Sequence, residues 1–377
     1  MRVLHITPYF SPAYGGPTVA VAQMVKAVVR LGVEVDVVTT TANGDNELDI
    51  PIGDFVDIDG VRCIFFRRSI LKSWMWSRGL MRWLDRNISD YDVVHIHGMF
   101  TFPGLVGCVF CRKYSIPYVI SPHGMLDKRC FSEKLWKKFP YFYLFEKRNF
   151  DSAAIIHVTS RLEAESIARF GYRNSIKLSP LCAEIVSHEQ VSYSESSAFK
   201  IVFVSRLVPI KGLEVLFDAV ALLASRNVAI RLDVVGSGDD AYVDTLMRRV
   251  SVLRLNESVF FHGHLNGVEK NEVLFGADVF VLPSYHENFS LSTVEAMGIG
   301  LPVIISDQVG IVDDVRAARA GYDFPAGSVS LLARAIERLT SVHERRQTGA
   351  NARELVIGKF SQELVGNYLF GFYSDLI

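Results

Sequence analysis

Residues 283–302 read P-S-Y-H-E-N-F-S-L-S-T-V-E-A-M-G-I-G-L-P, and this stretch decides the fold. The apolar run before it, residues 278–282, is typical of a buried parallel strand that the first proline of the stretch ends. A polar loop follows, and residues 291–298 are predicted to form a helix. Glu287 is placed on the loop, and Glu295 lies eight positions later, about one turn inside the helix.

The start of this predicted helix has the properties of an anion site. The amides of Phe289, Ser290 and Leu291, which follow Asn288, have no partner inside a helix, and the helix dipole favours negative charge there. One short element therefore offers amides to a phosphate and two carboxylates to sugar hydroxyls.

The pattern E-x7-E after a P-S strand end, followed by E-A-M-x-x-G-x-P-V, resembles the retaining, family-4-like glycosyltransferases of the GT-B fold, which use nucleotide-diphosphate sugars. The resemblance covers nearly the whole chain. It implies an α/β protein in which two Rossmann-like, doubly wound parallel-sheet domains face each other across a cleft. One position departs from the family pattern, because Ser290 stands where the family usually has glycine. A Cβ there is expected to narrow the space beside the donor phosphate.

The composition agrees with two globular domains. The chain has 377 residues, of which 49% are hydrophobic and 21% are charged, and its net charge of −1 makes a nucleic-acid partner unexpected. Residues 1–190 hold 23 Lys and Arg against 19 Asp and Glu, whereas residues 191–377 hold 17 against 22. The first half is therefore the better candidate for contact with an anionic surface.

Three features predict a cytoplasmic protein. No apolar run approaches the ~18 residues that span a bilayer, and the apolar start, residues 1–6, is too short for a signal peptide. Five cysteines, an odd number, suit reduced thiols. Cys108 and Cys111 form C-x-x-C inside an apolar helical run, where core packing is a better interpretation than a metal.

Strand-like and helix-like segments alternate along the chain, which predicts parallel sheets covered by helices. Strands are expected at residues 3–7, 33–39, 62–67, 93–98, 118–121 and 153–158, and again at 200–204, 231–235, 259–262, 278–282 and 302–306. A polar, serine-rich stretch separates these two groups. We therefore assign residues 1–185 to a first domain, 186–198 to a linker and 199–359 to a second domain. By resemblance, the first domain binds the acceptor, the second binds the donor, and a last helix at residues 360–377 crosses back to the first.

Arg206 and Lys211 lie in S-R-L-V-P-I-K-G, just past a predicted strand, and Gly212 then opens a helix. Negative charge builds on a diphosphate as the glycosidic bond breaks, so cations beside it stabilise the transition state. Arginine can grip a diphosphate through two bonds, and lysine acts as a point charge. The alternative is two ordinary surface cations, but cations are disfavoured at the start of a helix.

Two motifs of the first domain also follow strands. Gly15 and Gly16 lie between the first strand and the first helix, where paired glycines let a ligand approach the backbone, although a tight turn explains them equally well. By resemblance, this loop meets the donor diphosphate and the acceptor. His123 follows another buried strand, and a histidine here meets the donor sugar in the family. The alternative is a loop histidine with a structural partner.

The second domain has further loops at strand ends. Gly236, Gly238 and Ala241 fit G-x-G-x-x-A, which would indicate a dinucleotide site if it followed the first strand of the chain. Its place in the second domain favours, by resemblance, a loop near the nucleotide. His262 and Leu265 lie at the end of the next strand, where the family binds the base.

Metal binding is not expected. His95 and His97 share a face of one strand, and His123 could join them, but no acidic ligand lies close in the sequence. Residues 57–59 and 90–92 are D-x-D triplets, a pattern with which other transferases hold a metal and the diphosphate. Neither follows a buried strand of the required kind, so both are interpreted as turns and no metal ligand is assigned.

Two clusters of aromatic and basic residues suit the headgroup region of a membrane. One lies at residues 132–148 and includes Trp136. The other contains Trp74, Trp76 and Trp83 with two arginines. The alternative for both clusters is a packed helix with a solvated basic edge.

The sequence thus predicts a retaining, metal-independent glycosyltransferase that needs no cofactor. It would move a hexose from a nucleotide-diphosphate sugar, with UDP as the expected nucleotide, to a growing surface glycan or lipid-linked acceptor. The inner leaflet of the cytoplasmic membrane is a candidate partner. Two alternatives stay open, namely a nucleotide-sugar epimerase on the same fold and a non-catalytic sugar-nucleotide-binding protein.

The resemblance also assigns roles to residues. Glu295 would hold the ribose hydroxyls of the nucleotide, and Glu287 would hold hydroxyls of the donor sugar. Arg206 and Lys211, helped by the amides after Asn288, would stabilise the leaving diphosphate. These two cations, Glu287 and His123 are therefore the candidate catalytic residues.

Overall fold

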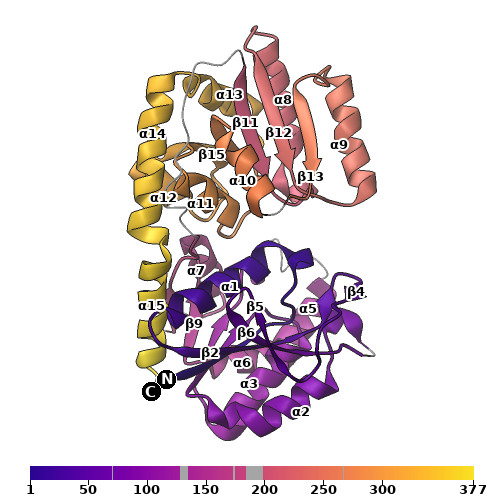
Figure 1. Cartoon of the computed structure of the whole chain (residues 1–377), viewed down its shortest axis with the longest axis vertical. Helices are drawn as coiled ribbons and strands as arrows, with labels where there is room; N and C mark the ends of the chain where they lie inside the picture. The colour runs from indigo at the N-terminus through magenta and orange to yellow at the C-terminus, as the bar shows by residue number, and fades with distance from the viewer. Residues whose placement is uncertain (70, 128–134, 173–174, 184–197, 266) are drawn as a thin grey trace. The chain divides into compact units, whose positions relative to one another are not determined.

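The computed structural model describes residues 1–69, 71–127, 135–172, 175–183, 198–265 and 267–377 (Figure 1). The chain forms two compact units. Unit 1 contains Met1–Cys182 and Gln362–Ile377, and unit 2 contains Ala183–Ser361. The linker expected at residues 186–198 lies outside the described residues except for its last position.

Unit 1 is built on an eight-stranded sheet in the order β10-β9-β8-β7-β1-β2-β6-β5. Every neighbouring pair is parallel except β5 and β6, which form a hairpin. The strands are β1 (Arg2–Ile6), β2 (Glu34–Thr40), β5 (Phe55–Ile58), β6 (Val61–Phe66), β7 (Val93–His97), β8 (Tyr118–Ser121), β9 (Ile155–Val158) and β10 (Ile176–Leu178). The strand order reverses between β1 and β7, and open α/β sheets bind ligands beyond the carboxyl ends of strands at such a point.

The helices of unit 1 cover both faces of this sheet (Figure 1). They are α1 (Gly16–Val29), α2 (Arg78–Asn87), α3 (Phe102–Tyr114), α5 (Leu135–Tyr141), α6 (Lys147–Asp151), α7 (Arg161–Ala168) and α15 (Gln362–Ser374). Strand residues alternate between the two faces. Leu4 and Ile96 belong to the apolar core formed with α2 and α3, whereas His5 and His95 are buried on the opposite face.

The last helix, α15, packs against α1 within unit 1. A Cβ added to Gly366 of α15 would lie 2.6 Å from the carbonyl oxygen of Ala27 on α1. Further along α15, the hydroxyl of Tyr373 is 2.7 Å from Nδ1 of His95. The helix therefore closes the face of the sheet on which the histidines lie.

Unit 2 is built on a six-stranded, all-parallel sheet in the order β13-β12-β11-β14-β15-β16. Its strands are β11 (Phe199–Val204), β12 (Ile230–Val235), β13 (Val259–Gly263), β14 (Val279–Leu282), β15 (Val303–Ser306) and β16 (Gly321–Phe324). The helices are α8 (Leu213–Ala224), α9 (Asp240–Val252), α10 (Gly267–Phe275), α11 (Leu291–Gly298), α12 (Val312–Ala318), α13 (Val329–Arg338) and α14 (Val342–Leu355). Two parallel-sheet, Rossmann-like units confirm the predicted fold class, and the strand order of unit 2 reverses between β11 and β14.

Several short elements were not predicted, including β5, β10, β16 and a separate hairpin of β3 (Ala42–Asn43) and β4 (Asn46–Glu47). The first D-x-D triplet begins in β5 and ends in the turn between β5 and β6. There Asp57 accepts a hydrogen bond from the amide of Gly60 at 2.9 Å. In the second triplet, Asp92 accepts a hydrogen bond from the amide of Arg2 at 2.7 Å. A residue of each triplet therefore has a structural partner within the protein.

The tryptophan cluster expected at a membrane is part of the core of unit 1. Trp74, Trp76 and Trp83 are partly buried against the apolar core. The indole of Trp74 also donates a hydrogen bond to the hydroxyl of Tyr141 at 3.1 Å. The cluster therefore packs as its alternative interpretation expected, although only Trp83 lies in an α-helix. Within the described part of the chain, we find no helix whose length and apolar character would let it cross a membrane.

The close approach of α15 to α1 predicts that a larger residue at this contact lowers the stability of the protein. Gly366→Ala should destabilise the protein by about 1–3 kcal/mol, because the new Cβ forces the two helices apart. Gly371→Ala in the same helix is the matched control, since its Cβ would meet no described atom within 4 Å. The control should gain up to about 1 kcal/mol from helix propensity. Urea unfolding of the two variants compares them, and equal effects would contradict the packing argument.

Candidate active site

Loops that leave the carboxyl ends of the unit 2 strands are joined by backbone hydrogen bonds. The amide of Leu207, after β11, donates to the carbonyl of Ser237, after β12, at 2.8 Å. Across the point where the strand order reverses, the amide of Tyr285 donates to the carbonyl of Ile210 at 2.8 Å. The bonds bring together the loops at residues 205–212, 236–238 and 283–290.

The G-x-G spacing in the loop after β12 has a packing explanation. A Cβ added to Gly236 would lie 1.8 Å from the carbonyl oxygen of Ser205, and one added to Gly238 would lie 2.1 Å from that of Leu207. Only glycine permits this approach between the two loops. The spacing therefore needs no dinucleotide to explain it, which removes the observation that suggested one.

Glu287 is held in place by both its backbone and its side chain. Its amide donates to the carbonyl of Gln308 at 3.0 Å, and its carbonyl accepts from the amide of Gly310 at 2.8 Å. Its carboxylate forms an ion pair with Lys211, and both side chains are largely buried. The structure thus brings together the two motifs that the sequence placed 76 positions apart.

Glu295 has a partner that the sequence analysis missed. It lies on α11, and its carboxylate is 2.7 Å from Nζ of Lys270 on α10. Lys270 belongs to no recognisable motif, so nothing in the sequence marks it. Each of the two candidate carboxylates therefore has its own lysine.

Arg206 differs from these lysines because its side chain is exposed. Its guanidinium makes no hydrogen bond or ion pair with any residue that the structure describes. A solvated cation that no described residue pairs with, on the same loop as Lys211, can accept a ligand anion without first breaking an ion pair with one of those residues.

At the start of α11, three amides have no hydrogen-bond partner among the residues that the structure describes. They belong to Phe289, Ser290 and Leu291. Ser290 is the N-cap residue, with φ of 78°, and its hydroxyl accepts from the amide of Thr293 at 3.3 Å. The left-handed backbone explains why glycine suits this position. The serine hydroxyl is bonded to Thr293 in the first turn of the helix.

His262 and Leu265 lie beside the loop after β12, because the amide of Gly236 donates to the carbonyl of Gly263 at 2.7 Å. The ring of His262 is 2.7 Å from the carboxylate of Asp233. Burial alone would raise the pKa of Asp233, but hydrogen bonds from Arg231 and His262 outweigh burial and hold that pKa below its usual value. His262 is thus fixed in position at the end of β13, and Leu265 is half-buried in the loop that follows.

In unit 1, the paired glycines begin α1. Gly15 is the N-cap residue, with φ of 60°, so the backbone conformation itself favours glycine there. A Cβ added to Gly15 or Gly16 would meet no described atom within 4 Å. The packing of the described residues therefore does not require Gly16 to be small.

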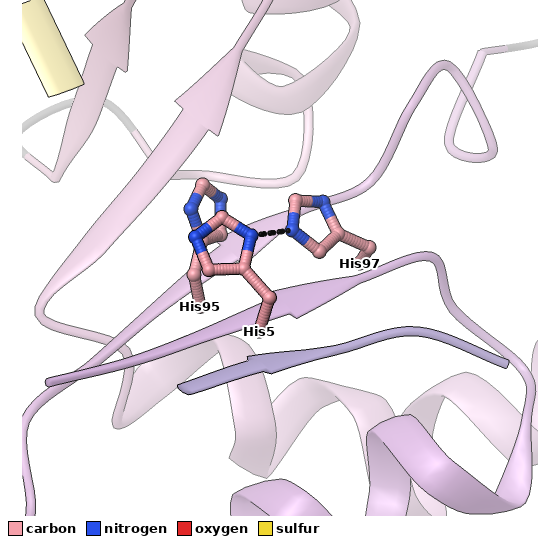
Figure 2. A group of neighbouring side chains, drawn as sticks. All are labelled: His5, His95 and His97. Atoms are coloured by element: carbon pink, nitrogen blue, oxygen red, sulfur yellow. Dashed lines mark hydrogen bonds between the residues drawn. The ribbon is translucent and has the colours of Figure 1, made fainter. Parts of the chain in front are cut away.

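His123 follows β8 and is bonded to the protein on one side. Its Nε2 is 3.0 Å from Nδ1 of His97, whose Nε2 is 2.9 Å from Nδ1 of His5. Figure 2 shows the rings of His5, His95 and His97 gathered on one face of the sheet, with the bond between His5 and His97 dashed. His123 thus has the structural partner that the alternative interpretation required.

These histidines are neutral near pH 7. Burial lowers the pKa of His5 to about 3 and that of His123 to about 4. Burial, assisted by repulsion between the rings, holds the pKa values of His95 and His97 well below the usual 6.5. The group can therefore exchange hydrogen bonds but carries no charge at neutral pH.

Two family models match the chain in succession. Glycosyltransferase Family 4 matches residues 14–180, and Glycosyl transferases group 1 matches residues 187–355. A relative is the capsular polysaccharide biosynthesis glycosyltransferase CapM of Staphylococcus aureus. It is 26% identical over 267 residues, which cover 64% of this chain and 67% of CapM.

Solved structures share the fold over the whole length. Sucrose-phosphate synthase from Thermosynechococcus elongatus has a TM-score of 0.83 at 23% identity, covering 100% of this chain and 99% of that one. HepE of Anabaena in complex with UDP-glucose has a TM-score of 0.77 at 18% identity, covering 100% of both chains. The chain belongs to the family-4-like glycosyltransferases of the GT-B fold.

The left-handed backbone of Ser290 predicts how substitutions there change the stability of the protein. A left-handed backbone costs a residue with a Cβ roughly 1–2 kcal/mol, whereas replacing a serine cap by glycine costs only about a few tenths. Ser290→Gly should therefore be as stable as the wild type or more stable by about 1 kcal/mol. Ser290→Ala keeps the strain and loses the cap, so it should be less stable by about 1 kcal/mol. Thermal melts rank the three proteins, and a Gly variant less stable than the Ala variant would refute this account.

Proposed function

We propose that this glycosyltransferase moves a hexose from a UDP-hexose to a surface glycan or lipid-linked acceptor, with retention of the anomeric configuration. The complex of HepE with UDP-glucose supports the nucleotide, and the role of CapM in capsule synthesis supports the acceptor class. The observation that carries the proposal is the convergence of Arg206, Lys211, Glu287 and the free amides of α11 on one edge of the unit 2 sheet.

The diphosphate of the donor would bind the positive groups of this edge. Arg206 offers a guanidinium that no described residue binds, Lys211 adds a second cation, and the amides at the start of α11 would donate hydrogen bonds. Charge that develops on the leaving diphosphate is stabilised by these groups. Because the protein itself supplies this positive charge, we propose a reaction that needs no metal ion.

The two carboxylates would bind different parts of the donor. Glu295 is fixed on a helix and would accept hydrogen bonds from the ribose, which all donors of one nucleotide share. Glu287 lies on the loop before the helix and would accept hydrogen bonds from the sugar. An ionised carboxylate has about four acceptor sites, so each can bind hydroxyls while its lysine stays close.

Retention can proceed by attack from the side on which the diphosphate leaves. The acceptor hydroxyl forms the new bond to the anomeric carbon as the bond from that carbon to the phosphate oxygen breaks. The proton of the hydroxyl passes to the departing phosphate oxygen, so the protein need not supply a base. Arg206 and Lys211 then hold the released nucleoside diphosphate.

An exposed aromatic surface in unit 1 favours a lipid-linked acceptor. Trp136 is 75% exposed and Leu144 is 71% exposed, far more than apolar side chains that pack in a core. Phe139 and Tyr143 are also about half exposed (51% and 52%). Lys147 lies in the next helix, so rings and cations are combined as at a membrane interface. We therefore propose that this surface contacts anionic lipid.

Arg206→Ala tests the diphosphate role. It should lower kcat/KM by about 10²-fold, the order of magnitude for loss of a charge-stabilising group. Its unfolding midpoint should equal that of the wild type, because the guanidinium has no partner among the described residues. Arg248→Ala, which removes an exposed cation from α9, is the control and should keep full activity. If the turnover of Arg206→Ala were close to that of the control, the proposed role of Arg206 at the diphosphate would be contradicted.

The roles of Glu287 and Glu295 can be distinguished by calorimetry with UDP alone and with the intact UDP-hexose. Glu295→Gln should weaken binding of UDP by about 10- to 150-fold, since a hydrogen bond to a charged group contributes about 1.5–3 kcal/mol. Glu287→Gln should bind UDP as the wild type does while kcat and sugar discrimination fall. The opposite pattern would reverse the assignment, and wild-type protein that binds neither UDP nor any UDP-hexose would overturn the proposed function.

A further inference from the structure

The ion pair between Lys270 and Glu295 lies outside the chemistry assigned to the diphosphate. Lys270 is on α10, which follows β13, and Glu295 is on α11, which follows β14, so both helices begin at the carboxyl edge of the parallel sheet of unit 2. Nζ of the lysine donates to Oε2 of the glutamate at 2.7 Å. The two side chains are 22% and 28% exposed, so neither is a freely solvated surface group.

The position of Lys270 conflicts with the local preference of its helix. It is the fourth residue of α10, where the helix dipole disfavours a cation. No acid lies three or four positions from it in the sequence, the spacings at which side chains of one helix meet. Glu269 and Glu272 of the same helix are exposed, whereas Lys270 bonds to α11. A local preference that is broken in this way is typical of a functional site.

The backbone fixes only the inner end of the Glu295 side chain. The residues on either side of it, Val294 and Ala296, are completely buried, which holds the Cα in place. A glutamate that is free to rotate beyond this point loses rotamer entropy when it binds a ligand. The bond to Lys270 holds the outer end, so the carboxylate is already oriented before a ligand arrives.

The bond to Lys270 also decides which oxygen of Glu295 faces a ligand. Oε2 accepts from the lysine, whereas Oε1 accepts no hydrogen bond from a residue that the structure describes. Each oxygen of a carboxylate can accept about two hydrogen bonds. A fixed oxygen with both acceptor sites open suits the two neighbouring hydroxyls of a ribose.

We propose that Lys270 is a positioning residue that orients Glu295, and that through it the protein prefers nucleotides with ribose hydroxyls to nucleotides without them. The inference rests on the proposed function, in which Glu295 binds the ribose of the donor. It gives the two paired lysines of the site different tasks. Lys211 acts on the diphosphate directly, and Lys270 acts on the ribose through Glu295.

Two other roles of Lys270 would have different consequences for binding. A lysine that contacts a phosphate would contribute equally to the affinity for UDP and for 2′,3′-dideoxy-UDP, which lacks both ribose hydroxyls. A lysine that only links α10 to α11 would contribute to the stability of the protein and not to the difference between these two ligands. The ratio of the two dissociation constants, here named the ribose preference, therefore separates the three roles.

Titration calorimetry of the full-length protein with UDP and with 2′,3′-dideoxy-UDP measures this ratio. The wild type should prefer UDP by about 10- to 150-fold, the contribution of a hydrogen bond to a charged group. Lys270→Met removes the charge, and it should lower the ribose preference by about 5- to 10-fold because Glu295 regains rotamer freedom. Any long-range attraction between the lysine and the diphosphate acts on both ligands and cancels in the ratio. Lys270→Gln is a second variant with the same expected result.

Two control variants test whether the effect is particular to Lys270. Lys211→Met should weaken both ligands by a similar factor and leave the ribose preference unchanged. Arg249→Met removes an ion pair with Asp218 between α9 and α8 of unit 2, whose side chains are 42% and 29% exposed. It should leave the ribose preference at the wild-type value.

A double-mutant cycle tests whether Lys270 acts through Glu295. If it does, Lys270→Met should change the ribose preference by less than about twofold once Glu295→Gln is already present, because coupled residues are not additive. A full effect of Lys270→Met in the Glu295→Gln protein would overturn the inference.

Two further outcomes distinguish a failure of the inference from a failure of the proposed function. Wild-type ribose preference in both Lys270→Met and Lys270→Gln, with UDP still bound, would overturn the role of Lys270 and leave the proposed function standing. Wild-type protein that binds no UDP would overturn the proposed function, and the role of Lys270 with it.

Discussion

The close backbone approach of Gly212 to Pro283 is the constraint on which the candidate donor site depends. A Cβ added to Gly212 would lie 2.3 Å from the carbonyl oxygen of Pro283, so no other residue fits without movement of a loop. This approach joins the loops after β11 and β14 at the point where the strand order reverses. Because the loops touch here, Lys211 can reach Glu287, and the cations and carboxylates share one edge of the sheet.

In unit 1 the main requirement is a different one: its buried polar side chains need hydrogen-bond partners. His5, His95 and His97 are almost completely buried, and each unpaired ring nitrogen would cost about 1–3 kcal/mol. The strands alone cannot satisfy them, because His5 and His95 both need the hydroxyl of Tyr373. The last helix therefore completes the polar core of unit 1, and its packing through Gly366 sets where that hydroxyl lies.

The features that could be predicted from the sequence are those that depend on short local patterns, such as strands and helix starts. Apolar runs located the central strands to within about two residues, and the helix at residues 291–298 has the bounds expected of it. Edge strands such as β16 were missed because they are short and only partly buried. Lys270 was missed because its role depends on how α10 packs beside α11. The hydrogen bonds that join the buried histidines to Tyr373 were missed because Tyr373 and His5 are 368 positions apart in the sequence. The environment of the tryptophans stayed open because a cluster of aromatic and basic residues suits a membrane surface and a packed core equally well.

The ion pairs of Glu287 and Glu295 bear on how a donor could bind. Two half-buried carboxylates without cations would repel a diphosphate and would lose hydration at a cost of several kcal/mol per charge. With Lys211 and Lys270 in place the pairs are neutral, and the exposed Arg206 leaves the group with one net positive charge. A diphosphate would gain Lys211 as a second partner while that lysine stays close to Glu287, and hydroxyls of the sugar would bind the remaining acceptor sites of the carboxylate. Neither charge of this pair would be left without a partner, so recognition of the phosphate and recognition of the sugar would be coupled.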